Sequence, residues 1–186
     1  MMLSPLSQVE AETALARFAD ALAVDADPLG PAAAALVQRV AACGSATQSD
    51  QAAAHHRAAV ALCVRAGLLI ADQAPAAGFS WDGKAVSIQT EPSVLIHEVA
   101  HYLLCPPERR ALPDFGLGAG PESGRSARAD SARVVDFAAR EREEAMASLL
   151  GIMWETALGQ PALAAFLEQN WLEGWHRAGG RAHIIG

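Results

Sequence analysis

The feature that most constrains this chain is a pair of histidines, four residues apart, inside a strongly apolar segment. The segment spans residues 93–104 and contains His97-Glu98-Val99-Ala100-His101. On a helix, residues four apart lie one above the other on the same face, so both imidazoles can reach one point. Polar side chains are costly to bury among apolar neighbours unless something pairs them. The spacing therefore predicts a metal-binding helix, with Glu98 placed to act as general base on a metal-bound water.

The flanking residues favour a helix over the same segment. Pro92 suits a first helical turn, and Thr90 can cap it. Cys105 is followed by two prolines, which disfavour helix at the residue before them. The preceding residues 84–90 alternate between apolar and polar, as in a half-buried strand.

The composition predicts one mainly helical domain over residues 1–186. Apolar residues make up 52% of the chain, largely because alanine, the best helix former, is abundant. We expect a mainly α fold with a small β-sheet (α+β), zincin-like, with the histidine helix packed against a second, acidic helix. Its expected parts are a helical scaffold (1–66), small strands with the metal helix (67–104), a Gly/Pro-rich loop (105–130), and a long acidic helix followed by a C-terminal helix (131–186).

The charge and the cysteines restrict the class of protein. A net charge of −7 argues against direct binding of nucleic acid, which needs a basic face. The three cysteines lack the spacing of a disulfide framework or a zinc knuckle, so we expect reduced thiols in a cytoplasmic protein. Neither a secretory signal nor a membrane-spanning run is visible, so no membrane partner is expected.

Two histidines leave a metal ion under-coordinated, so a third ligand is expected from the acidic helix, which we place at about residues 131–158. Glu144 and Glu141 are equally good candidates, because small residues follow each of them at helical spacing. Asp114 is a third choice. Glu143 is expected to point elsewhere, into solvent. Imidazole and carboxylate ligands suit one divalent ion, zinc or iron.

The loop after the metal helix carries further candidates. Arg109 and Arg110 could bind a substrate carboxylate, or anchor the loop to acidic helices. Asp114 could orient an imidazole or bind substrate, or turn the loop by bonding to its backbone. A loop this long is usually functional or mobile, which agrees with a substrate-binding role.

These residues together resemble the bacterial elongation factor P hydroxylase family. That family carries a His-Glu-x-x-His helix, an Arg-Arg pair, an Asp-aromatic-Gly turn and a later Pro-Asp-Gly-Arg. Here the matching residues are His97 to His101, Arg109-Arg110, Asp114-Phe115-Gly116, and then Pro121 with Gly124-Arg125. Leu117-Gly118-Ala119 stands where the family has aromatic residues. The resemblance implies an iron-like metal and an oxygen-dependent hydroxylation of a modified lysine on a translation factor.

Three functions therefore stay open. The first is a hydroxylase acting on a protein or peptide substrate, as the resemblance implies. The second is a zinc metallopeptidase-like hydrolase, in which Glu98 takes a proton from the metal-bound water. The third is a non-catalytic module that the metal stabilises and whose loop presents a partner-binding surface.

Overall fold

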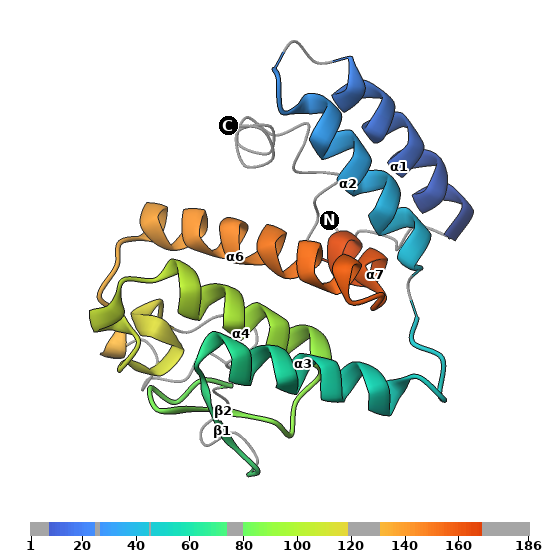
Figure 1. Cartoon of the computed structure of the whole chain (residues 1–186). Coiled ribbons are helices and arrows are strands. Elements are labelled where there is room, and N and C mark those ends of the chain that lie inside the picture. The colour runs from blue at the N-terminus through green and yellow to red at the C-terminus, as the bar shows by residue number, and fades with distance from the viewer. Residues whose placement is uncertain (1–7, 25–26, 45, 74–79, 119–130, 169–186) are drawn as a thin grey trace. The chain divides into compact units, whose positions relative to one another are not determined.

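A computed structural model describes residues 8–24, 27–44, 46–73, 80–118 and 131–168. It is mainly helical with one small sheet, which confirms the coarse α+β prediction (Figure 1). The chain divides into two compact units, residues 1–47 with 155–186, and residues 48–154. The prediction of a single domain stays a prediction.

The first unit is a small helical cluster built from both ends of the chain. It contains α1 (Gln8–Ala23), α2 (Gly30–Cys43) and α7 (Ala162–Glu168). The rings of Phe18 and Phe166 lie 6.2 Å apart, which joins the first helix to the last. The α2 helix has Pro31 in its first turn and Gly44 directly after its last residue, the positions at which proline and glycine favour helix ends. None of the helices in the described part of the chain is long and apolar enough to cross a membrane.

The second unit carries the two histidines. It contains α3 (Ala52–Ala66), β1 (Leu69–Ala71), β2 (Ala85–Ser87), α4 (Pro92–Leu104) and two short 3-10 turns, η2 (Pro107–Arg109) and η3 (Pro113–Gly116). The two strands pair in parallel, with Leu69 opposite Ala85. The long helix α6 (Phe137–Ala157) contributes all but its last three residues to this unit.

The metal helix α4 has the predicted extent but not the predicted cap. Its apolar residues Leu95, Ile96, Val99 and Ala100 are fully buried, so the helix forms part of the core. The N-cap residue is Glu91, in extended conformation, and no side chain caps the helix, so the prediction for Thr90 was wrong. Cys105 is also extended and ends the helix, as the following proline requires.

The acidic helix begins later than predicted. It starts at Phe137 instead of about residue 131, because Asp136 supplies the N-terminal cap. The Asp136 carboxylate accepts a hydrogen bond of 2.7 Å from the backbone N–H of Ala139. The helix is still long enough to carry all three of its candidate acids, Glu141, Glu143 and Glu144.

The segment after α4 is held in place by a turn that lies before β2. The Trp81 indole N–H donates to the carbonyl of Arg110 at 2.9 Å, and the Trp81 carbonyl accepts from the N–H of Asp114 at 3.1 Å. Gly83 also lies against this segment, because a Cβ built on it would stand 2.6 Å from the carbonyl oxygen of Ala111. These contacts fix residues 110–115 beside the metal helix.

Replacing Gly83 with alanine should destabilise the fold strongly. The residue has a φ of +93°, and its Cβ would collide with backbone atoms. We expect a loss of roughly 2–4 kcal/mol in the free energy of unfolding, measured by urea denaturation. Gly67→Ala is the control, because Gly67 also has positive φ but has nothing within 4 Å. It should lose only about 1 kcal/mol, and equal losses in the two variants would contradict this account of the turn.

Candidate metal centre

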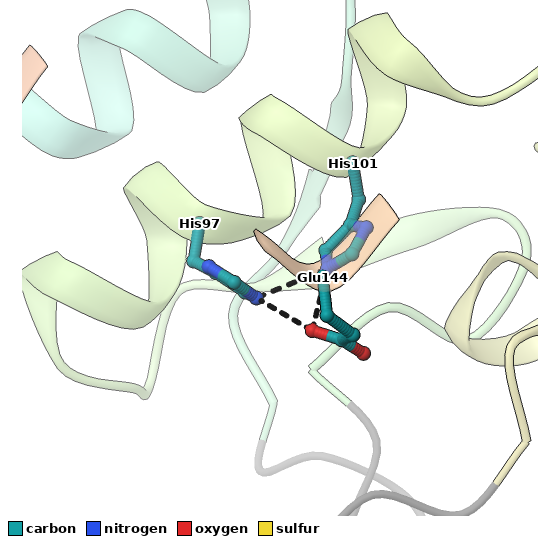
Figure 2. Close-up of side chains that lie close together, drawn as sticks. All are labelled: His97, His101 and Glu144. Atoms are coloured by element: carbon teal, nitrogen blue, oxygen red, sulfur yellow. Dashed lines mark hydrogen bonds and ion pairs between the residues drawn. The ribbon is translucent and has the colours of Figure 1, made fainter. Parts of the chain in front are cut away.

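The two histidines of α4 point to the same place, as their spacing predicts. Their Nε2 atoms lie 3.0 Å apart, and their ring planes make an angle of 82° (Figure 2). Two ring nitrogens that face each other so closely share at most one proton between them. A cation that accepts both lone pairs would satisfy them together.

Glu144 brings the third donor atom from α6. Its Oε2 lies 3.5 Å from Nε2 of His97 and 3.4 Å from Nε2 of His101 (Figure 2). Within the described residues, His97, His101 and Glu144 form the one group whose ligand atoms could hold a metal ion. The other candidates, Glu141 and Asp114, are not members of this group, and the side chain of Glu141 is exposed. Of the two glutamates that the sequence left equal, the structure favours Glu144.

The spacing of the three donor atoms fits a small divalent cation. Metal–ligand bonds of about 2.0–2.1 Å in tetrahedral geometry place neighbouring donors about 3.3 Å apart. The observed separations of 3.0, 3.4 and 3.5 Å average close to that value. Two histidines and one carboxylate also leave further coordination positions for water or substrate.

Small residues on α6 allow the acid to come so close. Ala147 is fully buried, and the Cβ position of Gly151 lies 3.8 Å from the Cα of His97. Gly151 lies seven residues beyond Glu144, on the same face of the helix. The close approach that the sequence predicts from these small residues is therefore confirmed.

The centre is open on one side and closed on the other. The side chains of Glu144 and His97 are 35% and 22% exposed, while that of His101 is 4% exposed. A ligand can therefore reach the centre past Glu144 and His97. His101 lies on the buried side, where protein groups surround it.

Glu143 forms the buried side, which corrects the expectation that it points into solvent. Its Oε1 lies 3.5 Å from Nδ1 of His101, and its Oε2 forms a close ion pair with Arg109. Arg109 also donates a hydrogen bond of 3.1 Å to the carbonyl of Phe115. Of the two roles considered for Arg109, these contacts favour anchoring the loop. Only the adjacency of Glu143 to Glu144 hints at this in the sequence, because the arginine lies 34 residues away.

An aromatic stack lies against the same histidine. The Phe115 ring stacks on His101 with centroids 5.6 Å apart, and on Trp81 at 5.4 Å. Phe115 and its neighbour Asp114 have φ values of +52° and +49°, a left-handed conformation that directs this ring inward. The sequence did not identify this stack, since its members are far apart in the chain.

The other two residues proposed to bind substrate have structural contacts. The guanidinium of Arg110 lies 4.3 Å above the ring of Tyr102, a cation–π contact. The backbone N–H of Asp114 donates to the Trp81 carbonyl at 3.1 Å, a contact between main-chain atoms, so the loop-turning role considered for its side chain stays a prediction. Neither residue belongs to the group of possible metal ligands.

Glu98, the expected general base, is buried and 7% exposed. Its negative charge affects the pKa values of two neighbouring groups. It helps to raise the pKa of His101, and it adds to the effect of burial in raising the pKa of the Cys63 thiol to about 11. The charge of Glu98 on α4 therefore affects both a neighbour on its own helix, His101, and a thiol on α3, Cys63.

The charges at the centre are strongly coupled. Burial by itself would lower the pKa of His101, but its ion-pair contacts with Glu143 and Glu144 outweigh burial and raise the pKa to about 10. Burial would raise the pKa of Glu144, but the two histidines lower it far below its usual value. Glu143 also has a lowered pKa, because His101 and Arg109 together outweigh its burial. In the metal-free protein, protonated His101 therefore supplies the positive charge that a metal cation would otherwise bring to the centre.

No family model, curated protein or solved structure matches this chain. The resemblance to the hydroxylase family therefore rests on the residues quoted above, and the function rests on the site.

Metal uptake should release protons. The raised pKa of His101 keeps a proton on the metal-free centre at neutral pH, and a metal ion has to displace it. Apparent affinity for zinc should therefore rise by about tenfold per pH unit between pH 6 and 8 for each proton displaced. Isothermal titration in buffers of different ionisation enthalpy measures the release, and a proton count of zero at pH 7.5 would contradict this charge arrangement.

Proposed function

We propose that this chain is a metal-dependent enzyme that hydroxylates a side chain of a protein substrate. His97, His101 and Glu144 hold one ferrous ion, and oxygen is the co-substrate. The strongest support is that residues shared with the elongation factor P hydroxylase family surround one ligand. Arg109 bonds the acid beside His101, and Phe115 of the Asp-Phe-Gly turn stacks on the same ring.

The open side of the centre suits a protein substrate. Glu144 and His97 are the exposed ligands, so a side chain from another protein can approach past them while His101 stays buried. The resemblance implies the substrate class, and we propose a lysine, free or modified, on a protein such as a translation factor.

Each part of the centre has a role in this chemistry. A bound ferrous ion would supply oxygen activation, and conversion of C–H to C–OH would consume one O₂, two protons and two electrons from an external two-electron donor, and release one water. Two neutral imidazoles and one carboxylate hold such an ion and leave positions open. Glu98, buried and coupled to His101, is suited to hold a proton near the centre.

A second candidate is a zinc-dependent hydrolase. The donor atoms lie 3.0–3.5 Å apart, and their average separation is close to the donor–donor distance in tetrahedral coordination, the geometry that zinc prefers. Neighbouring donors in octahedral coordination would be about 2.9–3.0 Å apart. Glu98 would then be the general base. Its burial argues against this role, because a base has to reach water on the open side of the ion.

Metal analysis after anaerobic purification separates the two candidates. The hydroxylase predicts iron and oxygen uptake that depends on a lysine-bearing protein substrate, tested first with elongation factor P. The hydrolase predicts zinc and peptide cleavage without oxygen. A protein that binds a metal but does neither would support the non-catalytic module.

Glu144→Gln should lose the metal, whereas Glu141→Gln should keep it. The two glutamates lie on the same helix three residues apart, but only Glu144 joins the group of possible ligands. We expect the affinity of Glu144→Gln for Zn²⁺ to fall by more than about a hundredfold, because loss of a direct ligand exceeds the usual loss of an outer partner. Competition with a chelator measures both variants, and similar affinities would remove Glu144 from the ligand set.

Glu98→Gln separates an enzyme from a metal-stabilised module. The substitution keeps the size of the side chain and removes its charge, so metal content should stay near one ion per chain. Turnover should fall by about 10²–10⁴-fold if Glu98 moves a proton. Metal content by elemental analysis and product by mass spectrometry are read on the same sample. Unchanged turnover would exclude a proton-transfer role for Glu98.

A further inference from the structure

We infer that Glu143 and Arg109 are positioning residues of the metal centre, which act through His101 instead of touching the ion or the substrate. This inference rests on the metal centre of the proposed function. It gives Glu143, which the sequence analysis expected in solvent, a role in positioning His101. It also gives Arg109 a role in supporting this ligand in place of substrate binding.

The contact between Glu143 and His101 is where the inference begins. Nδ1 of His101 and Oε1 of Glu143 lie 3.5 Å apart, an ion-pair distance slightly longer than a well-formed hydrogen bond. Both atoms are buried, and neither has a hydrogen-bond partner elsewhere in the part of the chain that the structure describes. Each atom therefore depends on the other to offset its burial.

This contact determines which nitrogen of His101 faces the metal. When Nε2 binds a cation, the ring proton has to be on Nδ1, and a carboxylate beside Nδ1 accepts it. The acceptor fixes the tautomer and the ring orientation, and it makes Nε2 a stronger donor. Among the described residues, His97 forms an ion pair through Nε2 alone, with Glu144, so an acid beside the second ring nitrogen is specific to His101.

Arg109 keeps Glu143 in the state that this role needs. Its guanidinium pairs with Oε2, the oxygen that does not face His101, and so stabilises the carboxylate as an anion. The same guanidinium donates through its other terminal nitrogen to the carbonyl of Phe115. Both side chains are largely buried, at 11% and 14% exposed, so solvent screens the pair weakly.

The four residues form a closed ring of contacts. His101 contacts Glu143, Glu143 contacts Arg109, Arg109 contacts the Phe115 backbone, and the Phe115 ring stacks on His101. The imidazole is thus held at its edge by an acid and at its face by an aromatic ring, and one arginine joins the two. Loss of either charged member should loosen the ligand without removing it.

Cobalt binding tests this role directly. Co²⁺ is titrated into metal-free protein, and both affinity and the visible absorption spectrum are measured, since the spectrum reports ligand geometry. Glu143→Gln should bind Co²⁺ about 10–100-fold more weakly than the wild type, and its absorption bands should shift. Glu141→Gln, an exposed acid two residues away, is the matched control and should change neither quantity.

A second pair of variants keeps the test decisive if Glu143→Gln folds poorly. Arg109→Gln should weaken Co²⁺ binding in the same direction, and Arg142→Gln, an exposed arginine on the same helix as Glu143, should not. The double variant of Glu143 and Arg109 should bind no more weakly than Glu143→Gln alone, because both residues act through one contact. Wild-type affinity and spectrum in either Glu143→Gln or Arg109→Gln would overturn the inference.

His101→Ala distinguishes failure of this inference from failure of the metal centre itself. If His101→Ala loses Co²⁺ binding while Glu143→Gln and Arg109→Gln match the wild type, the centre stands and the positioning role is wrong. If His101→Ala binds Co²⁺ as the wild type does, the centre is wrong, and the proposed function fails with it.

Discussion

The second unit depends on the convergence of one carboxylate and two imidazoles from different helices. Three donor atoms lie within 3.5 Å of one another, and one of the two imidazoles is almost fully buried. Without a cation, His101 has to keep a proton to balance Glu143 and Glu144. A divalent ion would supply the positive charge in its place and would satisfy the two facing ring nitrogens, which otherwise share one proton. This balance of charge connects the fold of the unit to the function proposed for it.

The surrounding structure serves to hold that arrangement. Gly151 lets α6 approach the backbone of α4, and the turn at Trp81 holds the segment that carries Phe115. Glu143 and Arg109 complete the support on the buried side, while Glu144 and His97 remain accessible. The centre is therefore buried on the side of His101 and partly exposed on the side of Glu144 and His97.

The sequence predicted what depends on local periodicity. Spacing of four placed both histidines on one face, prolines marked the two ends of α4, and small residues marked the face of α6 that packs against it. The choice between Glu144 and Glu141 depends on how α6 is rotated about its own axis relative to α4. No local sequence pattern determines that rotation. The role of Glu143 was missed for the same reason, because it depends on Arg109 and on the buried edge of His101. The later start of α6 reflects an aspartate cap that competed with a longer helical pattern.

Anomalous diffraction from crystals of the metal-loaded protein tests the central claim most directly. Data collected at the absorption edge of the bound metal should show one strong peak, about 2.0–2.3 Å from Nε2 of His97, Nε2 of His101 and an oxygen of Glu144. A peak at other residues, or no peak in protein that has been equilibrated with metal, would contradict the proposed centre and the function built on it.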